Sequence, residues 1–227
     1  CARQFLGETA RLLYRRPLDE ARLTELVDIA SYATEQTEDF YDGLALAIEA
    51  ILLSPEVIFI VDQTEPDPNR PGEQRLDDYS LAARLSFFLW NAPPDANLLL
   101  AAENGELSNP EGLARTVDRL IASSRLEAGM RAFFDDMLGF DDFNSLAKDP
   151  MVYPMVTGAT LADAREQTLR TIIDHVLTEE ADYRDLFTTR KTFMSMSLAP
   201  VYGTPSRDGW VPYEFDESSP RIGLLTH

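Results

Sequence analysis

The chain has 227 residues, of which 44% are hydrophobic and 10% aromatic, so it can bury a sizeable core and is not intrinsically disordered. Its formal net charge of −19 gives an acidic surface that repels phosphate backbones, which argues against nucleic acid as a partner. The single cysteine, Cys1, excludes an internal disulfide and a thiolate metal cluster, and the longest apolar runs, at 44–53 and 57–61, are too short to span a membrane. Acidity of this degree either keeps a protein soluble or attracts a basic partner, and the charge alone supports both readings.

Residues 1–61 predict three amphipathic helices, because their apolar side chains recur at steps of three and four. Pro17 breaks the first helix, since proline disfavours the helical conformation in the residue before it. Asp19 is a candidate cap for the second helix, and the third begins near Thr37. The apolar segment 57–61 follows a Ser-Pro pair and fits either a short helix or a buried extended piece.

A linker is predicted at residues 62–75, which hold three prolines and one glycine without an apolar anchor. It separates a three-helix N-terminal unit, 1–61, from a larger helical unit, 76–227, whose C-terminal end is rich in loops. We expect the second unit to continue in a longer parent chain.

The second half also shows helical spacing, and Asp77 is placed to cap a helix that runs through Trp90. We expect helices at about residues 77–90, 98–103, 108–122, 125–138 and 160–183. After residue 187 the chain is rich in turns, and no segment alternates with the period of a strand. The fold class predicted from these patterns is all-α, a multi-helix array with a loop-rich C-terminal end.

His175 lies on the longest predicted helix, beside Asp174 and one turn before Glu179. A di-iron bundle would need paired Glu-x-x-His motifs from two helices, but residue 172 is Ile. Two histidines in the whole chain also exclude a His-rich metal site. We therefore predict a surface or partly buried histidine, with a ligand or a catalytic base as the alternative, and we expect this chain to hold no metal and no cofactor.

Arginines are the charged residues that the pattern explains least well. Arg84 lies inside an otherwise apolar helix and needs a carboxylate if it is partly buried, and Asp95, beyond the corner after Trp90, is the predicted partner. Arg15 and Arg16 stand where the first predicted helix ends. We predict that these arginines order a junction between helices, with an anion-binding pocket as the alternative.

Four sequence blocks follow one another along nearly the whole chain, and the third is the most specific. They are Leu13-Tyr14-Arg15-Arg16-Pro17-Leu18; Leu52-Leu53-Ser54-Pro55 with Phe59; Leu76-Asp77-Asp78-Tyr79 with Arg84-Leu85-Ser86, Phe88-Leu89-Trp90 and Pro94-Asp95; and Leu198-Ala199 with Tyr202-Gly203 and Arg221-Ile222-Gly223-Leu224-Leu225-Thr226. In these blocks the chain resembles modular exported bacterial proteins, abundant in planctomycetes and myxobacteria, whose domains of unknown function accompany c-type cytochrome domains. The resemblance implies an exported, periplasmic location and redox-active neighbours.

The chain departs from this family's pattern at positions that bear on a ligand site. Ile60 replaces a usual arginine, and Pro200-Val201 replaces a basic residue and a histidine before Tyr-Gly. The Cys-x-x-Cys-His motif of the family's cytochrome module is absent, so this chain cannot itself attach haem, and c-type haem is expected only in partner domains.

The function that we expect is a non-catalytic scaffold or interaction module, whose partners are other domains of the parent protein or a c-type cytochrome. The alternative is a periplasmic hydrolase or oxidoreductase. Its active site would have to be completed by further segments, because no nucleophile elbow, P-loop or dinucleotide fingerprint occurs in the chain. A third reading is binding of an extracellular polymer through Tyr153, Trp210 and Tyr213.

Overall fold

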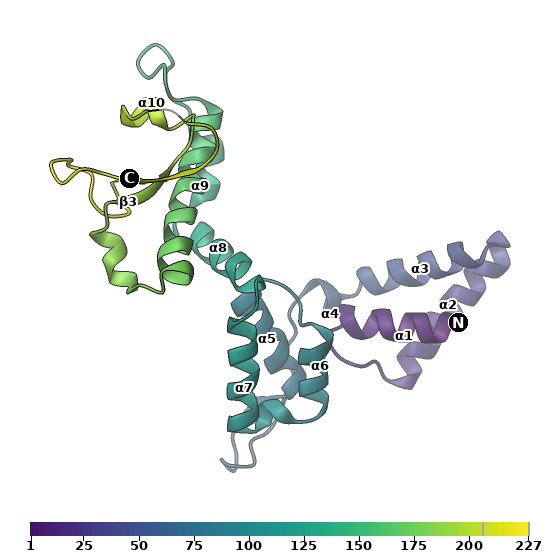
Figure 1. Ribbon diagram of the computed structural model, residues 1–227. Coiled ribbons are helices and arrows are strands. Elements are labelled where there is room, and N and C mark those ends of the chain that lie inside the picture. The colour runs from purple at the N-terminus through teal and green to yellow at the C-terminus, as the bar shows by residue number, and fades with distance from the viewer. Residues whose placement is uncertain (206, 227) are drawn as a thin grey trace. The chain divides into compact units, whose positions relative to one another are not determined.

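The structure, a computed structural model, describes residues 1–205 and 207–226. Their contacts divide the chain into two units, Cys1–Gly129 (unit 1) and Met130–His227 (unit 2). Helices dominate both units, and the described residues add two small antiparallel sheets of two strands each (Figure 1). The predicted all-α class is therefore confirmed. The predicted division of the chain at 62–75 stays a prediction.

Unit 1 begins with a bundle of three helices that lie side by side, α1 (Ala2–Leu13), α2 (Glu20–Thr37) and α3 (Phe40–Leu52). Asp19 caps α2 as predicted, because its side chain accepts a hydrogen bond from the Arg22 amide. Asp39 caps α3 in the same way. The apolar faces of the three helices meet in one core, formed by Leu6, Ala10, Tyr14, Leu26, Ala30, Ala47 and Ile51.

The apolar segment after this bundle is neither wholly helical nor buried. A short helix, α4 (Pro55–Ile58), ends inside it, and Phe59 is extended. The side chains of Ile58, Phe59, Ile60 and Val61 are all exposed. Of the two alternatives, the short helix is thus found for the start of the segment, and the buried extended piece is wrong, because periodicity shows that a run is apolar but not what covers it.

A β-hairpin occupies the predicted linker. Strand β1 (Thr64–Pro66) pairs antiparallel with β2 (Gln74–Leu76), and Arg75 binds Glu65 across the pair. The Pro- and Gly-rich residues between the strands form the turn. Strands of three residues are too short to show an alternating pattern, which is why the sequence did not reveal them.

The rest of unit 1 packs around Trp90. It contains α5 (Asp78–Trp90), α6 (Ala96–Glu103), the 3-10 helix η1 (Glu106–Ser108) and α7 (Pro110–Ile121). Asp77 caps α5 as predicted, accepting the Ser80 amide at 2.7 Å. The Trp90 indole is buried and donates to the Leu120 carbonyl at 2.9 Å. Helix α8 (Arg125–Met137) then begins tightly against α5, since a Cβ on Gly129 would lie 2.1 Å from the Leu89 carbonyl oxygen.

Unit 2 contains the remainder of α8, the 3-10 helix η2 (Phe140–Ser145) and α9 (Gly158–Ile173), followed by the π-helical turn η3 (Asp174–Thr178) and the 3-10 helix η4 (Tyr183–Phe187). The predicted helix 160–183 is thus wrong at its C-terminal end, where the regular α-helix stops at Ile173. Strands β3 (Lys191–Met194) and β4 (Val211–Glu214) form an antiparallel pair, with the short helix α10 (Ala199–Tyr202) between them. No helix of the described residues is long and apolar enough to cross a membrane.

Candidate functional site

Arg15 is a buried cation that binds backbone carbonyls. Only 8% of the surface of Arg15 is exposed, and its guanidinium donates to the carbonyls of Glu56, Val57 (3.1 Å) and Phe59 (2.7 Å). These carbonyls belong to the end of α4, where a helix leaves its last acceptors without helical partners. Burial, together with the neighbouring charge of Arg16, lowers the pKa of Arg15. Arg15 therefore fastens α4 to the end of α1.

Arg16 connects the N-terminal bundle to α5. Its guanidinium lies 3.1 Å from a carboxylate oxygen of Asp77, and it also donates to the Ser80 hydroxyl and to Gln63. Partial burial of Asp77 opposes its ionisation, but hydrogen bonds from Ser80 and Arg16 outweigh this effect, so the pKa of Asp77 is lowered. Asp77 thus has two roles, as the cap of α5 and as the partner of Arg16.

The predicted pairing of Arg84 with Asp95 is wrong. Arg84 is exposed, with 58% of its side chain accessible, and it pairs with Asp62 at 2.5 Å. Asp95 caps α6 and pairs with Arg119 at 2.8 Å. The hairpin brings residue 62 beside α5, and nothing in the spacing of the sequence indicates this approach.

Trp90 is enclosed by arginines. The guanidinium carbons of Arg119 and Arg125 lie 5.8 and 5.0 Å from the centre of its ring, within the range of cation–π attraction. Since Trp90 is also buried, it serves as a packing centre of unit 1 and is not open to a ligand.

The pocket beside Arg15 and Arg16 does not favour an anion. Its volume is about 300 Å³, and Arg22 contributes a third guanidinium to its lining. Each arginine already has acceptors: the carbonyls of α4 for Arg15, Asp77 for Arg16 and Glu25 for Arg22. Two carboxylates, Asp19 and Glu56, line the same pocket. These contacts support the reading that the arginines order a junction.

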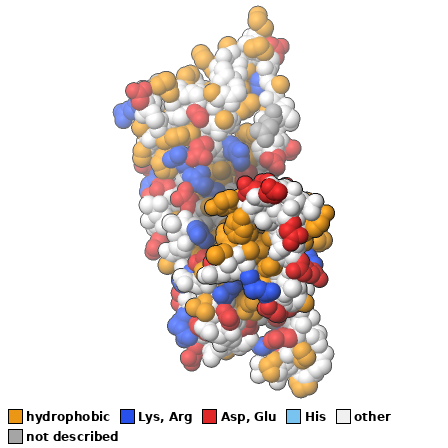
Figure 2. Space-filling model, turned by 90° about the vertical axis from the view of Figure 1, so that its right-hand side faces the viewer, with side chains coloured by type: hydrophobic (Ala, Val, Ile, Leu, Met, Phe, Trp, Pro, Cys, Tyr) orange, Lys and Arg blue, Asp and Glu red, His pale blue; other side chains and the backbone are white. Residues whose placement is uncertain are grey.

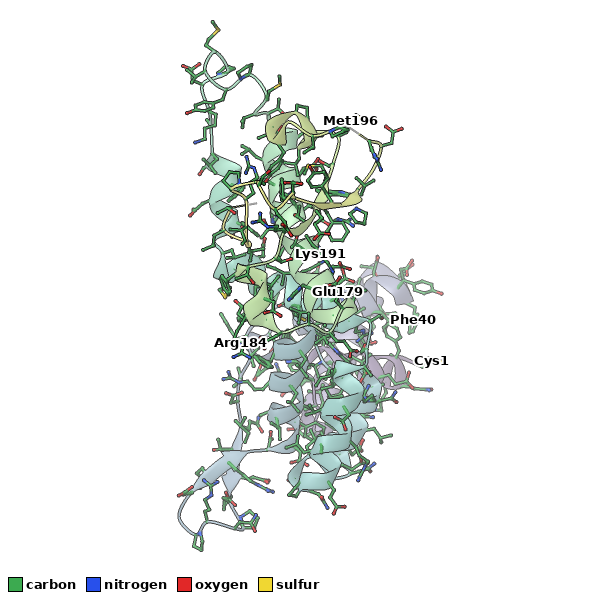
Figure 3. All side chains as sticks on the ribbon, turned by 60° about the vertical axis from the view of Figure 1, so that its left-hand side comes forward. Cys1, Phe40, Glu179, Arg184, Lys191 and Met196 are labelled. Atoms are coloured by element: carbon green, nitrogen blue, oxygen red, sulfur yellow. The ribbon has the colours of Figure 1, made fainter. Side chains whose placement is uncertain are left out.

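His175 lies in unit 2, in the π-helical turn, and it is more deeply buried than predicted, with 8% of the residue exposed. Its Nε2 atom is 2.9 Å from the carbonyl oxygen of Asp182, and its Nδ1 atom is 3.8 Å from a carboxylate oxygen of Glu179. The other oxygen of Glu179 accepts a hydrogen bond from Lys191 at 2.6 Å (Figure 3). This hydrogen bond lowers the pKa of Glu179 and raises that of Lys191. π-Helical turns are frequent at functional sites, which makes this position a candidate for ligand binding.

A pocket of about 290 Å³ opens beside His175, and most of its lining comes from β3 and β4. Lys191, Thr192 and Phe193 belong to β3, and Pro212, Tyr213 and Glu214 belong to β4. Sequence reasoning missed these residues because it predicted no strands there. The charged pair Lys191 and Glu214, which face each other in the sheet, could have been found only with the strand register known.

A larger cavity, of about 740 Å³, also lies in unit 2, between α8, η2 and α9. Its charged side chains neutralise one another: Arg165 binds Asp135 through two hydrogen bonds of 2.5 and 2.6 Å, and Arg131 binds Glu166. Asp135 is therefore an ion-pair partner of Arg165. Among the described residues, no group of three His, Cys, Asp or Glu side chains is placed to hold a metal ion.

The aromatic residues proposed for polymer binding do not form a common exposed surface. Trp210 is covered by the Arg170 guanidinium at 5.1 Å, and Tyr213 packs edge-on against Phe215. Tyr153 is exposed and lies 5.8 Å from the Lys148 ammonium. Two of the three rings are thus occupied by neighbouring side chains.

Family comparison places the chain among proteins of unknown function. Residues 76–204 match the family described as "PSD4: Protein of unknown function (DUF1592)", and residues 1–62 match "PSD5: Protein of unknown function (DUF1595)". The first match covers more than half of the chain, so the chain belongs to the DUF1592 family. No curated protein and no solved structure matches the chain. The resemblance to domains of unknown function is confirmed at this level.

Proposed function

We propose that this chain is a non-catalytic helical scaffold and interaction module of an exported, cytochrome-associated protein, and that its acidic surface docks a basic partner. The partner is a c-type cytochrome or a basic domain of the parent protein, and any haem belongs to that partner. The location implied by the family resemblance is periplasmic.

One observation carries this proposal. Residues 23–69 contain eleven Asp and Glu residues and no Lys or Arg. The junction of α2 and α3 presents part of this run as an acidic end of the bundle, formed by Glu35, Glu38 and Asp42 with the aromatic ring of Tyr41. All four are exposed, and Tyr41 is 77% exposed.

Charge and aromatic surface together suit a docking site better than they suit solubility alone. Carboxylates without basic neighbours steer a positively charged partner, while an aromatic side chain supplies contact area with little loss of conformational entropy. Figure 2 shows acidic and apolar side chains beside one another on the face turned toward the viewer. The partner that fits this surface carries lysines or arginines around an apolar centre.

The test measures binding of a basic c-type cytochrome by calorimetry at two salt concentrations. We expect the affinity to fall by about tenfold when salt rises from about 20 to 200 mM, since surface charges are screened over this range. The triple variant Glu35→Gln, Glu38→Gln, Asp42→Asn should lose about tenfold in affinity at the lower salt. Asp39 is kept because it caps α3.

A matched triple variant, Glu111→Gln, Asp118→Asn, Glu217→Gln, changes the total charge equally at exposed positions elsewhere. It should keep the affinity within about threefold of the original. Equal losses in both triple variants would show that only total charge matters, and the acidic end of α2 and α3 would then not be a docking site.

A further inference from the structure

The pocket beside His175 has a chemistry that the docking proposal does not use. It lies within unit 2, between the π-helical turn η3 and the β3–β4 pair, and its volume of about 290 Å³ holds one side chain or a small molecule. Polar groups reach it from the turn and from both strands.

His175, which lines this pocket, has one ring nitrogen that acts as an acceptor. The Asp182 carbonyl can only accept a hydrogen bond, so the Nε2 atom of His175, 2.9 Å away, carries the hydrogen. In the neutral ring Nδ1 is then an acceptor. Its nearest charged neighbour is Glu179, itself an acceptor, at 3.8 Å, which is beyond hydrogen-bond distance. Among the described contacts, this nitrogen of a buried side chain has no hydrogen-bond donor.

Lys191, Thr171 and Thr192 each donate a hydrogen bond to a neighbouring group of the protein. Lys191 donates to Glu179 at 2.6 Å. The Thr171 hydroxyl donates to the Gln167 carbonyl at 2.8 Å, so the hydrogen bond of 3.0 Å between Thr171 and Thr192 uses the hydrogen of Thr192. The Thr192 oxygen keeps its capacity to accept. A ligand group that reaches His175 Nδ1 and the Thr192 oxygen meets acceptors there and must therefore bring donors.

The charge of the lining points the same way. Asp174, Glu179 and Glu214 contribute three negative charges, and Lys191 contributes one positive charge. Asp174 and Glu214 also act on Lys191, where they help Glu179 to raise the pKa of its ammonium. The carboxylates thus favour a positive charge at this place, and Lys191 satisfies only part of that preference.

We infer that the pocket beside His175 binds a single organic cation, the ammonium or guanidinium group of a lysine or arginine side chain. The cationic head lies among Asp174, Glu214 and His175 Nδ1, and the aliphatic stem lies against Phe193 and Tyr213. A free alkylamine has the same chemistry as a lysine side chain, and the test separates these two sources. The site lies in unit 2, so it is independent of docking at the acidic end of α2 and α3.

The binding test uses the full chain and small capped peptides. Acetyl-Gly-Arg-Gly-amide and acetyl-Gly-Lys-Gly-amide are the cationic probes, citrulline and norleucine replace Arg and Lys in neutral controls, and n-butylammonium is the free amine. The chain has two histidines, so the imidazole signals in a proton–nitrogen spectrum can be followed individually during titration.

We expect cationic peptides to shift the His175 signal with millimolar affinity, at least about tenfold tighter than the neutral peptides. If butylammonium binds with the same affinity as the cationic peptides, the cationic head group with its stem is the whole ligand. If butylammonium binds more weakly than the peptides, the site is assigned to a protein side chain.

Variants connect the binding to named groups. Asp174→Asn with Glu214→Gln should weaken the cationic peptides by about tenfold, whereas the exposed pair Asp208→Asn with Glu217→Gln should leave them within about twofold. Lys191→Met removes the internal competitor for Glu179 and should tighten binding several-fold, a gain that misfolding cannot produce. Equal affinity for arginine and citrulline peptides, or an unchanged affinity in both the Asp174/Glu214 and the Lys191 variants, would overturn the inference.

Discussion

Arg15 and Arg84 carry the same charge, but the fold surrounds them with different groups. Arg15 is buried and donates to three carbonyls at the end of α4, whereas Arg84 lies on the surface and meets Asp62. An exposed ion pair gains little, because water and salt screen both charges. A buried donor that satisfies several buried acceptors is costly to remove, because the acceptors lose their partners without regaining water.

We therefore expect Arg15→Met to lower the free energy of unfolding by roughly 2–4 kcal/mol. The backbone of Arg15 has a positive φ of 60°, and this conformation is as unfavourable for methionine as for arginine. The change in the free energy of unfolding therefore reports the lost hydrogen bonds. Urea unfolding followed by circular dichroism measures the change. Arg84→Met is the control and should keep the original midpoint. Equal midpoints for the two variants would contradict a binding role of Arg15 at α4.

The helix that carries an arginine could be predicted from the sequence, but the partner of its side chain could not. The helical pattern placed Arg84 on α5 and Asp77 at its cap, because both inferences depend on neighbours within four residues. The choice of Asp62 over Asp95 depends on a hairpin that returns the chain to α5, and no local pattern reports that path. The lining of the His175 pocket was missed for the same reason.

At the scale of elements, helix starts were easier to predict than helix ends. Asp19 and Asp77 are capping residues whose side chains accept a backbone amide of the first turn. The C-terminal end of α2 lies at Glu38, a left-handed residue with φ of 57°, and glutamate gives no signal for this conformation. The strands β3 and β4 have four residues each and pair across an intervening helix, so their periodicity was too short to detect.

Glu38→Gly should raise the free energy of unfolding by about 1 kcal/mol, because glycine adopts the left-handed conformation without a clash at Cβ. Asn91 ends α5 with a similar φ of 51° and is the matched comparison. Asparagine tolerates this conformation better than glutamate, so Asn91→Gly should gain less. Both changes are measured by urea unfolding. A loss of stability in Glu38→Gly would show that the Glu38 side chain makes a contact worth more than the backbone strain.

For the whole molecule, the family segments and the compact units do not coincide. The match to DUF1592 begins at residue 76 and continues to 204, past the limit of unit 1 at Gly129. Unit 1 combines the segment 1–62 with the first part of that match. Ion pairs cross this internal border at Arg11–Glu103 and Arg16–Asp77. The segment 1–62 and the first part of the DUF1592 segment therefore share one compact unit, although the composition of residues 62–75 predicts a linker between them.

Fragments of the chain distinguish these two descriptions. If residues 1–129 form one unit, a fragment 1–137, which keeps α8 complete, should unfold in a single cooperative transition. A fragment 1–75 loses the partners of Arg11 and Arg16, so its midpoint of thermal unfolding should lie roughly 10 °C lower. Circular dichroism measures both, and Arg16→Met in the longer fragment should account for part of the difference. If 1–75 instead melted at the midpoint of 1–137, the N-terminal helices would be an independent domain and the linker at 62–75 would be the true boundary. The same result would separate the acidic end of α2 and α3 from α5, so docking could then be studied on the short fragment alone.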